Sequence, residues 1–517
     1  MKLFVKKFRC EPYSPRESGV VKIFTRPFMK HEVGTEEYWQ LSGLNYKKPK
    51  RIIIIVPNKT TERDALERKY KDKIVVNPHL SRKLVSFQAN KATPIYNWFK
   101  FKEGFSSEMV RLFVNEFKVK PKNVLDPFSG SGTTILTARN LGIPSIGIEM
   151  MPIGQFVLES KLAAERVDLS QLAKTFELLK NVDFSKVEKD KNFKHVSITS
   201  GAFPEETERR LNGFLSYISK NVKDEDIRKV LLFACFCILE SISYTRKDGQ
   251  YLRWDSRSGR TKTNFNKGRI YKFEEALFGQ IKTILDDLRT PLYFYEKNEN
   301  PTDVKIIQGS CLEIMPSLEG EQFDLVITSP PYCNRYDYTR TYALELAFLG
   351  VDSNGIKQLR QNLLSATVEN KEKQDFLLSV YSKNKQEKLL KLAEEAFEST
   401  SALQEVLEIL DEYKKQKKLN NPGIYRMVKN YFYEHSFVIF ELSRLLRKGG
   451  RIYYVDDNVR YAGETIPVDF ILSEFAKKAG LNVKNIYVLQ NGKGNSSQQM
   501  GVHGREELRK SVCVWEK

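Results

Sequence analysis

Short apolar runs alternate with amphipathic stretches over most of the chain. Between Met109 and Phe117, apolar residues recur at helical spacing, which predicts a helix with one face on a core. Further along, strand-like runs alternate with helical stretches, as is typical of a doubly wound α/β fold. Seven strands are expected, at Asn123 to Phe128, Pro144 to Met150, Val304 to Ser310, Phe323 to Tyr332, Gly449 to Asn458, Val483 to Asn491 and Ser511 to Lys517. We therefore predict an α/β protein built on a seven-stranded, Rossmann-like sheet.

Glycine marks the expected ends of two helices. The stretch TTILTARNL is expected to end at Gly142, and FVIFELSRLLRKGG at the pair Gly449 and Gly450. Glycine adopts the left-handed conformation that closes a helix without a steric penalty.

Two intervals are too long for simple crossovers, whose loops usually span about two to six residues around a helix. The interval 202–300 holds an apolar helix and then a polar, basic stretch, and 351–422 is charged with helical periodicity. The region 1–84 is basic and mixed, with an apolar run at Arg51 to Val56 followed by a helix-like stretch. The expected organisation is an accessory region at 1–84, two parts of one sheet at 85–201 and 301–350, insertions at 202–300 and 351–422, and closing strands and helices at 423–517.

Composition narrows the class of protein. Of 517 residues, 41% are hydrophobic and 29% charged, which is typical of a globular protein and not of a disordered chain. The 84 basic residues outnumber the 65 acidic ones and give a formal charge of +19. A surface this basic attracts a polyanion, and nucleic acid is the natural candidate. The alternative is a solubilising surface without a partner.

Several features bear on the compartment. No run approaches the roughly 18 apolar residues of a membrane span, and charge interrupts the apolar stretches of Met1 to Arg9, unlike a signal peptide. Six cysteines occur without a CxxC pair or a Cys/His cluster at zinc spacing. Reduced thiols in a cytoplasm, no membrane and no metal site are the expectation.

The segment DPFSGSGTT, Asp126 to Thr134, lies where the first strand gives way to a helix, which is where a doubly wound fold binds its ligand. Gly130 and Gly132 lack Cβ, so the backbone can turn tightly and bring N–H groups close to a cofactor. No Gly-Lys-Ser/Thr ending follows, which argues against a nucleotide hydrolase. At the end of the second strand stands Glu149, where an acid can accept hydrogen bonds from both ribose hydroxyls of an adenosine ligand; a solvent-facing carboxylate is the alternative.

The segment TSPPY, Thr328 to Tyr332, follows the apolar strand FDLVI and therefore also lies on the ligand side of the sheet. Together, DPFSGSGTT and TSPPY resemble the cofactor and catalytic motifs of the amino-group DNA methyltransferases, in cofactor-first order. The segment LVSFQANKATPIYNWFKFKEGFS resembles the remaining cofactor motif of that family, and the resemblance extends from about Leu84 to Lys517. It implies a methyltransferase sheet with its cofactor half at 85–201, its catalytic half at 301–350 and S-adenosylmethionine as methyl donor.

The resemblance also implies the cofactor residues. Asp126 would face the ammonium group of the cofactor. Ser310 follows the third strand, where the family often has an acid that contacts the adenine, and serine would be a weaker partner. The implied set is Asp126, Phe128, Gly130, Gly132, Thr133, Glu149 and Ser310.

Catalysis at an exocyclic amino group needs hydrogen-bond acceptors, because the nitrogen lone pair is delocalised into the base. Ser329 and the carbonyl of Pro330 can accept, and with Pro331 the backbone becomes rigid. Tyr332 can stack on a base rotated out of the duplex. Cytosine C5 methylation uses the cysteine of a Pro-Cys pair as nucleophile. Here Tyr332 separates Pro331 from Cys333, so Cys333 is not expected to act as a nucleophile. The initial serine resembles the cytosine N4 enzymes more than the adenine N6 enzymes, but some of the latter carry serine, so both bases remain open.

The two motifs lie about 200 residues apart, and in the family's alpha-like arrangement this interval holds the target-recognition region. Its basic stretch, Thr245 to Arg269, interleaves cations with aromatic residues, as expected where phosphates are neutralised and bases packed. A charged surface loop is the alternative. The candidate DNA-binding residues are Arg246, Lys247, Arg253, Trp254, Arg257 and Arg260.

The sequence thus predicts a DNA methyltransferase that acts on double-stranded DNA in the cytoplasm, at the nucleoid, with companion restriction or defence proteins as possible partners. Two other functions remain open. One is an RNA base N-methyltransferase, because related motifs occur in such enzymes, and the other is a DNA-binding subunit that keeps the fold without transferring methyl groups.

Overall fold

The computed structural model of the chain describes residues 61–117, 119–248, 251–290, 302, 304–489, 503–504 and 506–517, together with two short strands before residue 61. The chain divides into two compact units, Met1–Ala65 and Leu66–Lys517. In the first, β1 (His31–Glu32) pairs antiparallel with β2 (Ile53–Ile54), which lies within the apolar run expected to form a strand. Helix α1 (Glu62–Tyr70) follows.

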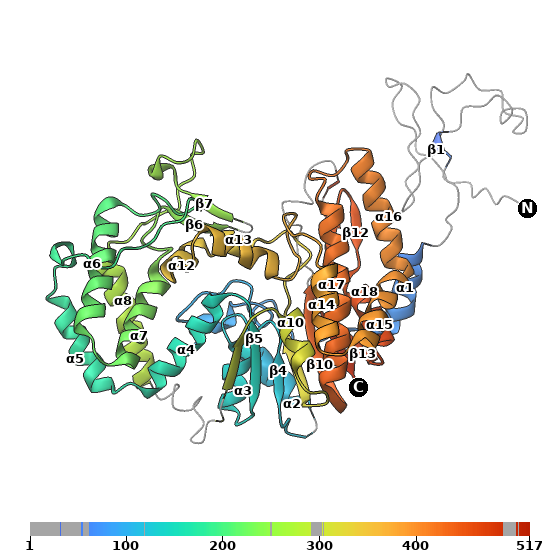
Figure 1. Cartoon of the computed structure of the whole chain (residues 1–517), viewed down its shortest axis with the longest axis horizontal. Helices are drawn as coiled ribbons and strands as arrows, with labels where there is room; N and C mark the ends of the chain where they lie inside the picture. Colours follow the sequence, from blue (N-terminus) through green and yellow to red (C-terminus); the bar gives the residue numbers. More distant parts are fainter. Residues whose placement is uncertain are drawn as a thin grey trace, which may run out of the picture. The chain divides into compact units, whose positions relative to one another are not determined.

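An eight-stranded sheet forms the centre of the second unit (Figure 1). In spatial order its strands are β3 (Ile74–Val76), β13 (Asn482–Val488), β14 (Lys510–Glu516), β10 (Leu446–Asp457), β9 (Phe323–Thr328), β4 (Val124–Asp126), β5 (Ser145–Glu149) and β8 (Val304–Gln308). β14 runs antiparallel to both neighbours, and the other neighbouring strands are parallel. The predicted mixed α/β, Rossmann-like class is confirmed.

The sheet has one strand more than the seven predicted. The extra strand, β3, comes from the region 1–84 and pairs in parallel with β13 at the sheet edge. It spans three residues, and Val75 and Val76 are 38% and 55% exposed. A strand this short and exposed shows no alternation of buried and polar positions, so the hydrophobic pattern does not mark it.

The strand order reverses between β4 and β9. From β4 the chain continues to β5 and β8 on one side, whereas β9 leads to β10 on the other. Ligands of doubly wound folds bind at such a reversal, outside the carboxyl ends of the strands. The two motif loops, after Asp126 and after Thr328, leave the sheet at these ends.

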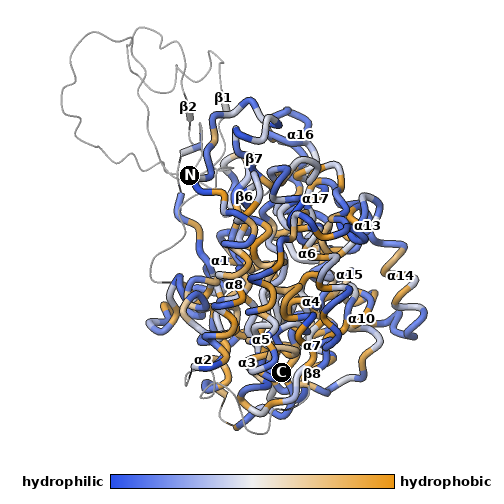
Figure 2. The backbone as a smooth tube through the Cα atoms, turned by 90° about the vertical axis from the view of Figure 1, so that its left-hand side faces the viewer, coloured by the Kyte–Doolittle hydropathy of each residue, from blue (hydrophilic) through white to orange (hydrophobic). Residues whose placement is uncertain are grey.

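Alternate residues of the central strands face different cores. Val326 joins the core built with α10 (Cys311–Ile314), α17 (Ile424–Leu445) and α18 (Val468–Lys478). Its neighbours Leu325 and Ile327 join the core that contains α2 (Ser107–Asn115) and part of α3 (Thr133–Asn140). Figure 2 shows hydrophobic positions concentrated in the middle of this unit and hydrophilic ones toward its periphery.

Of the two helix ends predicted from glycines, one is confirmed and the other is wrong. Gly142, at φ +67°, follows the last residue of α3 by two positions, and this confirms the predicted stop. The stop predicted for α17 at Gly449 is wrong, because the helix ends at Leu445 and the chain enters β10 at Leu446. Gly449, at φ +78°, instead lies within the β10 span, whose pairing with β9 shifts register between Leu446 and Arg451.

The helices between β5 and β8 form a helical body with a hairpin (Figure 1), and its core also includes residues from elsewhere, such as Leu136 and Ala343. The helices are α4 (Pro152–Arg166), α5 (Leu169–Lys180), α6 (Glu205–Asn221), α7 (Glu225–Ile238) and α8 (Phe273–Arg289), and the hairpin strands are β6 (Thr245–Asp248) and β7 (Tyr251–Trp254). Phe214, Phe233 and Phe236 lie in their shared core with no exposed surface. The apolar helix predicted in the first insertion is therefore α7, which contacts α4 and α8.

The interval 351–422 is helical, as its periodicity indicated. It holds α13 (Ser353–Asn362), α14 (Gln374–Lys383), α15 (Glu387–Glu398) and α16 (Ser401–Lys415), and the last three share a core with α17. Shorter elements of this unit include α11 (Tyr338–Thr341), α12 (Ala343–Phe348), β11 (Val459–Tyr461) and β12 (Glu464–Ile466). Among the described residues, no helix has the length and apolar character needed to cross a bilayer.

Candidate active site

The loop between β4 and α3 depends on its glycines. Gly130 and Gly132 have φ values of +52° and +79°, which lie in the left-handed region that favours glycine. A Cβ on Gly130 would lie 2.9 Å from Cε1 of Phe101, and one on Gly132 would lie 2.9 Å from Cδ1 of Leu158. The loop therefore needs glycine both for its conformation and for the space around it.

A third glycine of this region, Gly154, lies outside the DPFSGSGTT motif. Gly154 lies in the first turn of α4, and a Cβ there would lie 2.1 Å from the carbonyl oxygen of Gly130. The helix therefore packs directly on the glycine loop. The nearby Pro152 at the helix start is the kind of local signal that places this turn.

Glu149, at the end of β5, holds the loop in place. Its Oε2 accepts a hydrogen bond from the backbone N–H of Gly130, and its Oε1 accepts one from Met151, both at 2.7 Å. Burial raises the pKa of Glu149 to about 7, against the effect of these two hydrogen bonds.

Asp126, at the end of β4, is 1% exposed. Its Oδ1 accepts hydrogen bonds from Oγ1 of Thr328 at 2.7 Å and from the backbone N–H of Phe128 at 3.1 Å. Burial raises the pKa of Asp126 to about 6, although these hydrogen bonds favour its charged form. Two buried carboxyls with raised pKa values in one cleft are typical of a functional site.

A cavity of about 580 Å³, including its open side, brings most of the predicted residues together. Asp126, Phe128, Gly130, Thr133 and Glu149 line it with Ser329 and Pro331 of the tetrapeptide SPPY, Ser329 to Tyr332. The two motifs therefore meet in one pocket. The segment that resembles the remaining cofactor motif also reaches this cavity, through Phe101, Glu103, Gly104 and Phe105, and the glycine loop adds Ser129 and Ser131. Three further lining residues that the sequence analysis did not single out are Met151, Tyr338 and Leu363.

A second cavity of about 280 Å³ adjoins the first. Ser310 and Gly309 line it, and Phe128, Glu149 and Leu363 line both cavities. Leu363 directly follows α13 and belongs to the interval 351–422. This segment thus supplies part of the pocket wall, a role that no pattern in its sequence indicates. Gly132 lines neither cavity and packs against Leu158 instead.

In the tetrapeptide, the hydroxyl oxygens of Ser329 and Tyr332 lie within hydrogen-bonding distance, at 2.9 Å. Burial raises the pKa of Tyr332, so its phenol keeps its proton. A residue far along the chain, Lys510, donates a hydrogen bond from its Nζ to the Tyr332 hydroxyl at 2.9 Å. Ser329 and Pro331 line the large cavity, whereas their neighbours in the chain, Pro330 and Tyr332, do not.

Cys333 is buried, and its backbone carbonyl accepts a hydrogen bond from the Tyr461 hydroxyl at 2.7 Å. Burial raises the pKa of its thiol well above the usual value. A buried thiol that keeps its proton is a poor nucleophile.

The candidate DNA-binding residues lie on and after the β6–β7 hairpin. Arg246 and Arg253 are paired across its strands, so they point to the same face, and Arg253 also stacks on Phe265 at 3.9 Å. Arg260 stacks on Trp254 at 4.4 Å. Cations stacked on aromatic rings provide rigid, positively charged positions on this surface.

Arg257 has a structural partner. Its guanidinium makes two hydrogen bonds of 2.8 Å to the two carboxylate oxygens of Asp255, which is fully buried. It also donates to the carbonyl of Gly268 at 2.7 Å. The residue is exposed, but it orders the turn after β7 as well as adding charge.

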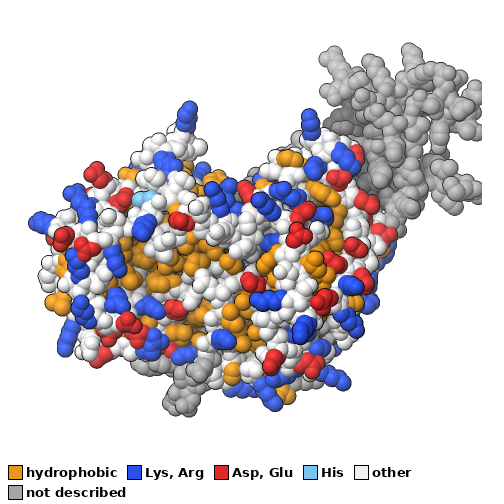
Figure 3. All heavy atoms as spheres, viewed as in Figure 1, with side chains coloured by type: hydrophobic (Ala, Val, Ile, Leu, Met, Phe, Trp, Pro, Cys, Tyr) orange, Lys and Arg blue, Asp and Glu red, His pale blue; other side chains and the backbone are white. Residues whose placement is uncertain are grey.

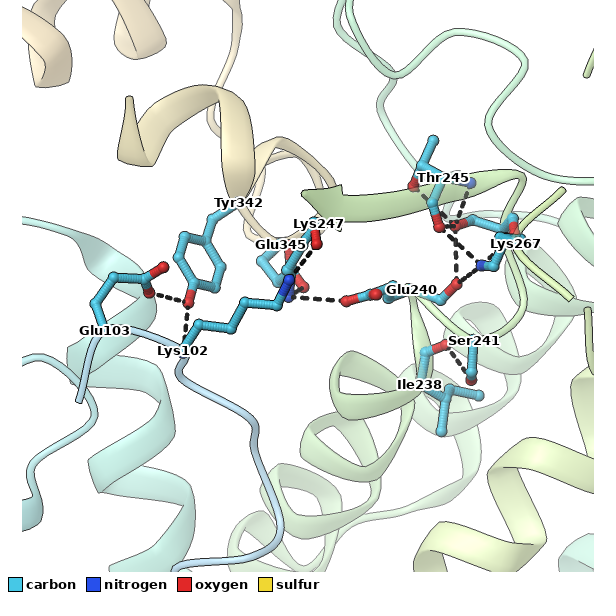
Figure 4. Close-up of polar contacts among 11 residues, drawn as sticks. Lys102, Glu103, Ile238, Glu240, Ser241, Thr245, Lys247, Lys267, Tyr342 and Glu345 are labelled. Atoms are coloured by element: carbon cyan, nitrogen blue, oxygen red, sulfur yellow. Dashed lines mark hydrogen bonds and ion pairs between the residues drawn. The ribbon is translucent and has the colours of Figure 1, made fainter. Parts of the chain in front are cut away.

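Lys247 points inward instead. It is 4% exposed, forms an ion pair with the buried Glu345, and lies 4.5 Å from the ring centre of Tyr342 (Figure 4). Alternate residues of a strand face opposite sides, so Arg246 lies outside and Lys247 inside. This inward position does not fit a phosphate contact. The prediction that Lys247 is a DNA-binding residue is therefore wrong.

The ammonium group of Lys267 is also held by the protein, although the residue is only partly buried. Its Nζ donates to the carbonyl oxygens of Glu240, Ser243 and Thr245 at 2.5 to 2.7 Å (Figure 4). Burial lowers the pKa of Lys267 to about 8. The lysine therefore ties the loop after β7 to the start of β6.

Comparison with known proteins gives consistent matches. A family model described as DNA methylase matches residues 28–153, which include the glycine loop. The Type II methyltransferase M.AvaI of Anabaena variabilis is 47% identical over 461 residues, covering 88% of this chain and 92% of the relative. The protein of the same name from Nostoc sp. gives the same values.

A further relative is the Type II methyltransferase M.BsoBI of Geobacillus stearothermophilus. It is 43% identical over 472 residues, which cover 88% of this chain and 92% of the relative. These matches extend over both motifs and both insertions.

Proposed function

Since this chain belongs to the DNA methylase family of amino-group methyltransferases, we propose that it transfers a methyl group from S-adenosylmethionine to the exocyclic amine of a DNA base, and that this amine is cytosine N4. The observation that carries the proposal is the shared pocket, which Asp126 lines from the glycine loop and Ser329 from the tetrapeptide. Direct transfer requires the methyl donor and the amine to meet in one place.

The packing around the glycines supports a site for S-adenosylmethionine. The spaces left by the missing Cβ atoms of Gly130 and Gly154 let the loop, α4 and Phe101 lie against one another around the cavity. The two cavities share Phe128, Glu149 and Leu363 as lining residues, so one elongated ligand, such as a nucleoside with an amino-acid chain, could extend from the first cavity into the second. We assign the smaller cavity, with Ser310, to the adenine ring.

The polar groups of the pocket fit the same cofactor. Glu149 is placed to accept hydrogen bonds from ribose hydroxyls, and Asp126 to face the ammonium group of the methionine part. When bound, S-adenosylmethionine supplies an electrophilic methyl carbon on a sulfonium. Both carboxyls are charged at the alkaline side of their raised pKa values, about 7 and about 6, and charge favours these contacts.

Ser329 and Pro330 act on the target amine. The serine hydroxyl and the proline carbonyl accept hydrogen bonds from its two hydrogens, which favours a tetrahedral nitrogen with a localised lone pair. Rigid placement of such acceptors before the reaction is a main source of catalysis in water-poor sites. The serine supports cytosine N4 as the target, and adenine N6 is the second candidate, since its amine has the same chemistry.

The β6–β7 hairpin and the loop after β7 support DNA as the substrate. Figure 3 shows Lys and Arg side chains around the hollow at the top of this face and on the loop projecting beside it. Arg246 and Arg253 lie on the hairpin strands, and Arg260 lies in the loop after β7. Neutralising phosphates there would hold the duplex while the target base is rotated out.

The names of the relatives, Type II methyltransferases, support a place in a restriction–modification system. We infer that the enzyme protects a specific sequence in the cell's DNA, in the cytoplasm at the nucleoid, from a companion nuclease.

The test is transfer of label from methyl-labelled S-adenosylmethionine to duplex DNA or to RNA, followed by mass analysis of the nucleosides. We expect label in DNA alone and N4-methylcytosine as the product. N6-methyladenine would overturn the choice of base. Label in RNA alone would overturn the substrate, and label in neither, with DNA still bound, would indicate a DNA-binding subunit.

A further inference from the structure

A largely buried lysine lies against the tyrosine of the tetrapeptide. Nζ of Lys510 is 2.9 Å from the Tyr332 hydroxyl and 3.0 Å from Oδ1 of Asp457, and its side chain is 15% exposed. Lys510 lies on β14 and Asp457 on β10, where the two residues are directly paired across the sheet. The strand register therefore fixes this cation beside the active site.

The hydrogen bonds of this group have a defined direction. An ammonium group has three donors and no acceptor, so the Tyr332 oxygen must accept from Lys510. The Tyr332 hydrogen is then free to be donated to Oγ of Ser329, 2.9 Å away. Ser329 lines the large cavity, so the chain of hydrogen bonds from Lys510 ends at the pocket wall.

The protonation states support this direction. Burial alone would lower the pKa of Lys510, but the Asp457 carboxylate and Tyr332 outweigh burial and raise it. Burial also raises the pKa of Tyr332. Both groups therefore keep their protons at neutral pH, and neither accepts a proton from the substrate.

We propose that Lys510 is a positioning residue for methyl transfer, which acts through Tyr332. It anchors the phenol hydroxyl, so that the ring is held ready to stack on the rotated base and Oγ of Ser329 is held beside the amine. The inference rests on the proposed function, and it assigns a role to a residue outside both motifs.

The expected effect is on turnover and not on binding. Lys510→Met should lower kcat about 10- to 100-fold, since small displacements of reacting groups have effects of this size. KM for DNA and the Kd for S-adenosylhomocysteine should stay within about threefold, because Lys510 lines neither cavity. Lys510→Arg keeps the charge and the donors and should restore most of the activity.

A double-mutant cycle tests the route through Tyr332. In a Tyr332→Phe background the hydroxyl is absent, so Lys510→Met should cause no further loss of kcat. Lys484→Met is the matched control, because it removes the same charge from β13, where Lys484 pairs with Glu516 at 3.3 Å. Thermal unfolding is measured for each variant, and Lys510→Gln replaces Lys510→Met in the cycle if the latter does not fold.

Three outcomes would overturn the inference. These are an unchanged kcat in Lys510→Met, additive losses in the cycle, and a loss confined to KM for DNA, which would make Lys510 a DNA contact. A wild-type enzyme that labels DNA alongside an equally active Lys510→Met refutes the positioning role alone. A wild-type enzyme that labels no DNA refutes the proposed function and this inference with it.

Discussion

Oγ1 of Thr328 donates a hydrogen bond of 2.7 Å to Oδ1 of Asp126 in the interior of the protein. The two residues are 202 positions apart, and they end adjacent parallel strands, β9 and β4. One residue precedes the tetrapeptide and the other opens the glycine loop. The position of Ser329 relative to the cofactor pocket therefore depends on a contact between the ends of these two strands.

Thr328→Val tests this contact. Valine keeps the shape of threonine but removes the donor, so a buried carboxyl oxygen loses a partner. We expect the free energy of unfolding to fall by about 1 to 3 kcal/mol, and kcat to fall as well, because the two loops are no longer held together. Urea unfolding and initial rates measure the two effects. Thr328→Ser keeps the hydroxyl and is the control, and equal loss in both variants would contradict the role of the hydrogen bond.

Asp126→Asn should separate stability from function. Burial raises the pKa of Asp126 from 3.8 to about 6. The folded value exceeds the unfolded one, so the stability linked to this carboxyl is fully present below about pH 4 and is lost as the pH rises through 6. Asparagine has no charge to bury, so the variant should melt at a higher temperature than wild type at pH 8, with a smaller difference at pH 5.

The same substitution should weaken cofactor binding, because the charged partner of the ammonium group is gone. Calorimetry with S-adenosylhomocysteine at pH 8 measures this, and we expect a loss of about tenfold or more, as for a charged hydrogen bond of 1.5 kcal/mol or so. A variant that melts lower than wild type at pH 8 and binds the cofactor equally well would refute both parts.

The sequence predicted the parts of the site that local chemistry defines. The glycine loop and the Pro-Pro pair are short motifs at the carboxyl ends of apolar strands, and a doubly wound sheet brings such ends together. That is why Asp126, Glu149 and Ser329 could be named in advance, and all three line the same cavity.

Other parts of the site follow from contacts that the local pattern does not contain. Lys510 reaches Tyr332 only because β14 pairs antiparallel with β10, and that register is set by the whole sheet. Leu363 reaches the pocket because the segment after α13 is held by a distant helix. Lys247 shows the reverse case, since the predicted cation lies on the inner side of a strand only four residues long.

Ser329→Ala should retain cofactor binding and lose most turnover. Ser329 lines the pocket, and its hydroxyl contacts that of Tyr332. The hydrogen bonds given above for Asp126 and Glu149 do not involve Ser329. Removing an acceptor that acts on the reacting nitrogen should lower kcat by about 10²-fold or more. Single-turnover rates with saturating cofactor measure the effect, and Ser131→Ala, at another serine of the cavity wall, is the control. An unchanged rate would remove Ser329 from the mechanism.

Charge reversal on the hairpin should weaken DNA binding. Arg246→Glu combined with Arg253→Glu places two like charges where phosphates are expected, so the Kd should rise and the slope of log Kd against log salt should become shallower by about two phosphate contacts. Arg257 is left intact because its loss would disturb the turn held by Asp255. Lys282→Glu on α8 makes the same kind of change elsewhere on the helical body, and a similar effect there would point to net charge and not to the hairpin.

Glu434→Gln tests whether the interval 351–422 contributes to cofactor binding. Glu434 of α17 is 1% exposed; its Oε2 accepts a hydrogen bond from the backbone N–H of Ser365, and its Oε1 pairs with Lys373, both at 2.7 Å.

These contacts fix the segment that carries Leu363 into the pocket wall. Loss of one partner of a buried ion pair costs about 3 to 5 kcal/mol in stability, so we expect a lower melting temperature and a raised KM for S-adenosylmethionine. kcat at saturating cofactor should change less, because Ser329 and Tyr332 keep their partners. Glu394→Gln is the control. Glu394 accepts a hydrogen bond of 2.8 Å from the hydroxyl of Tyr433, which precedes Glu434 in α17. A Glu434→Gln variant with a normal KM and a reduced kcat would show that this segment serves catalysis and not the cofactor.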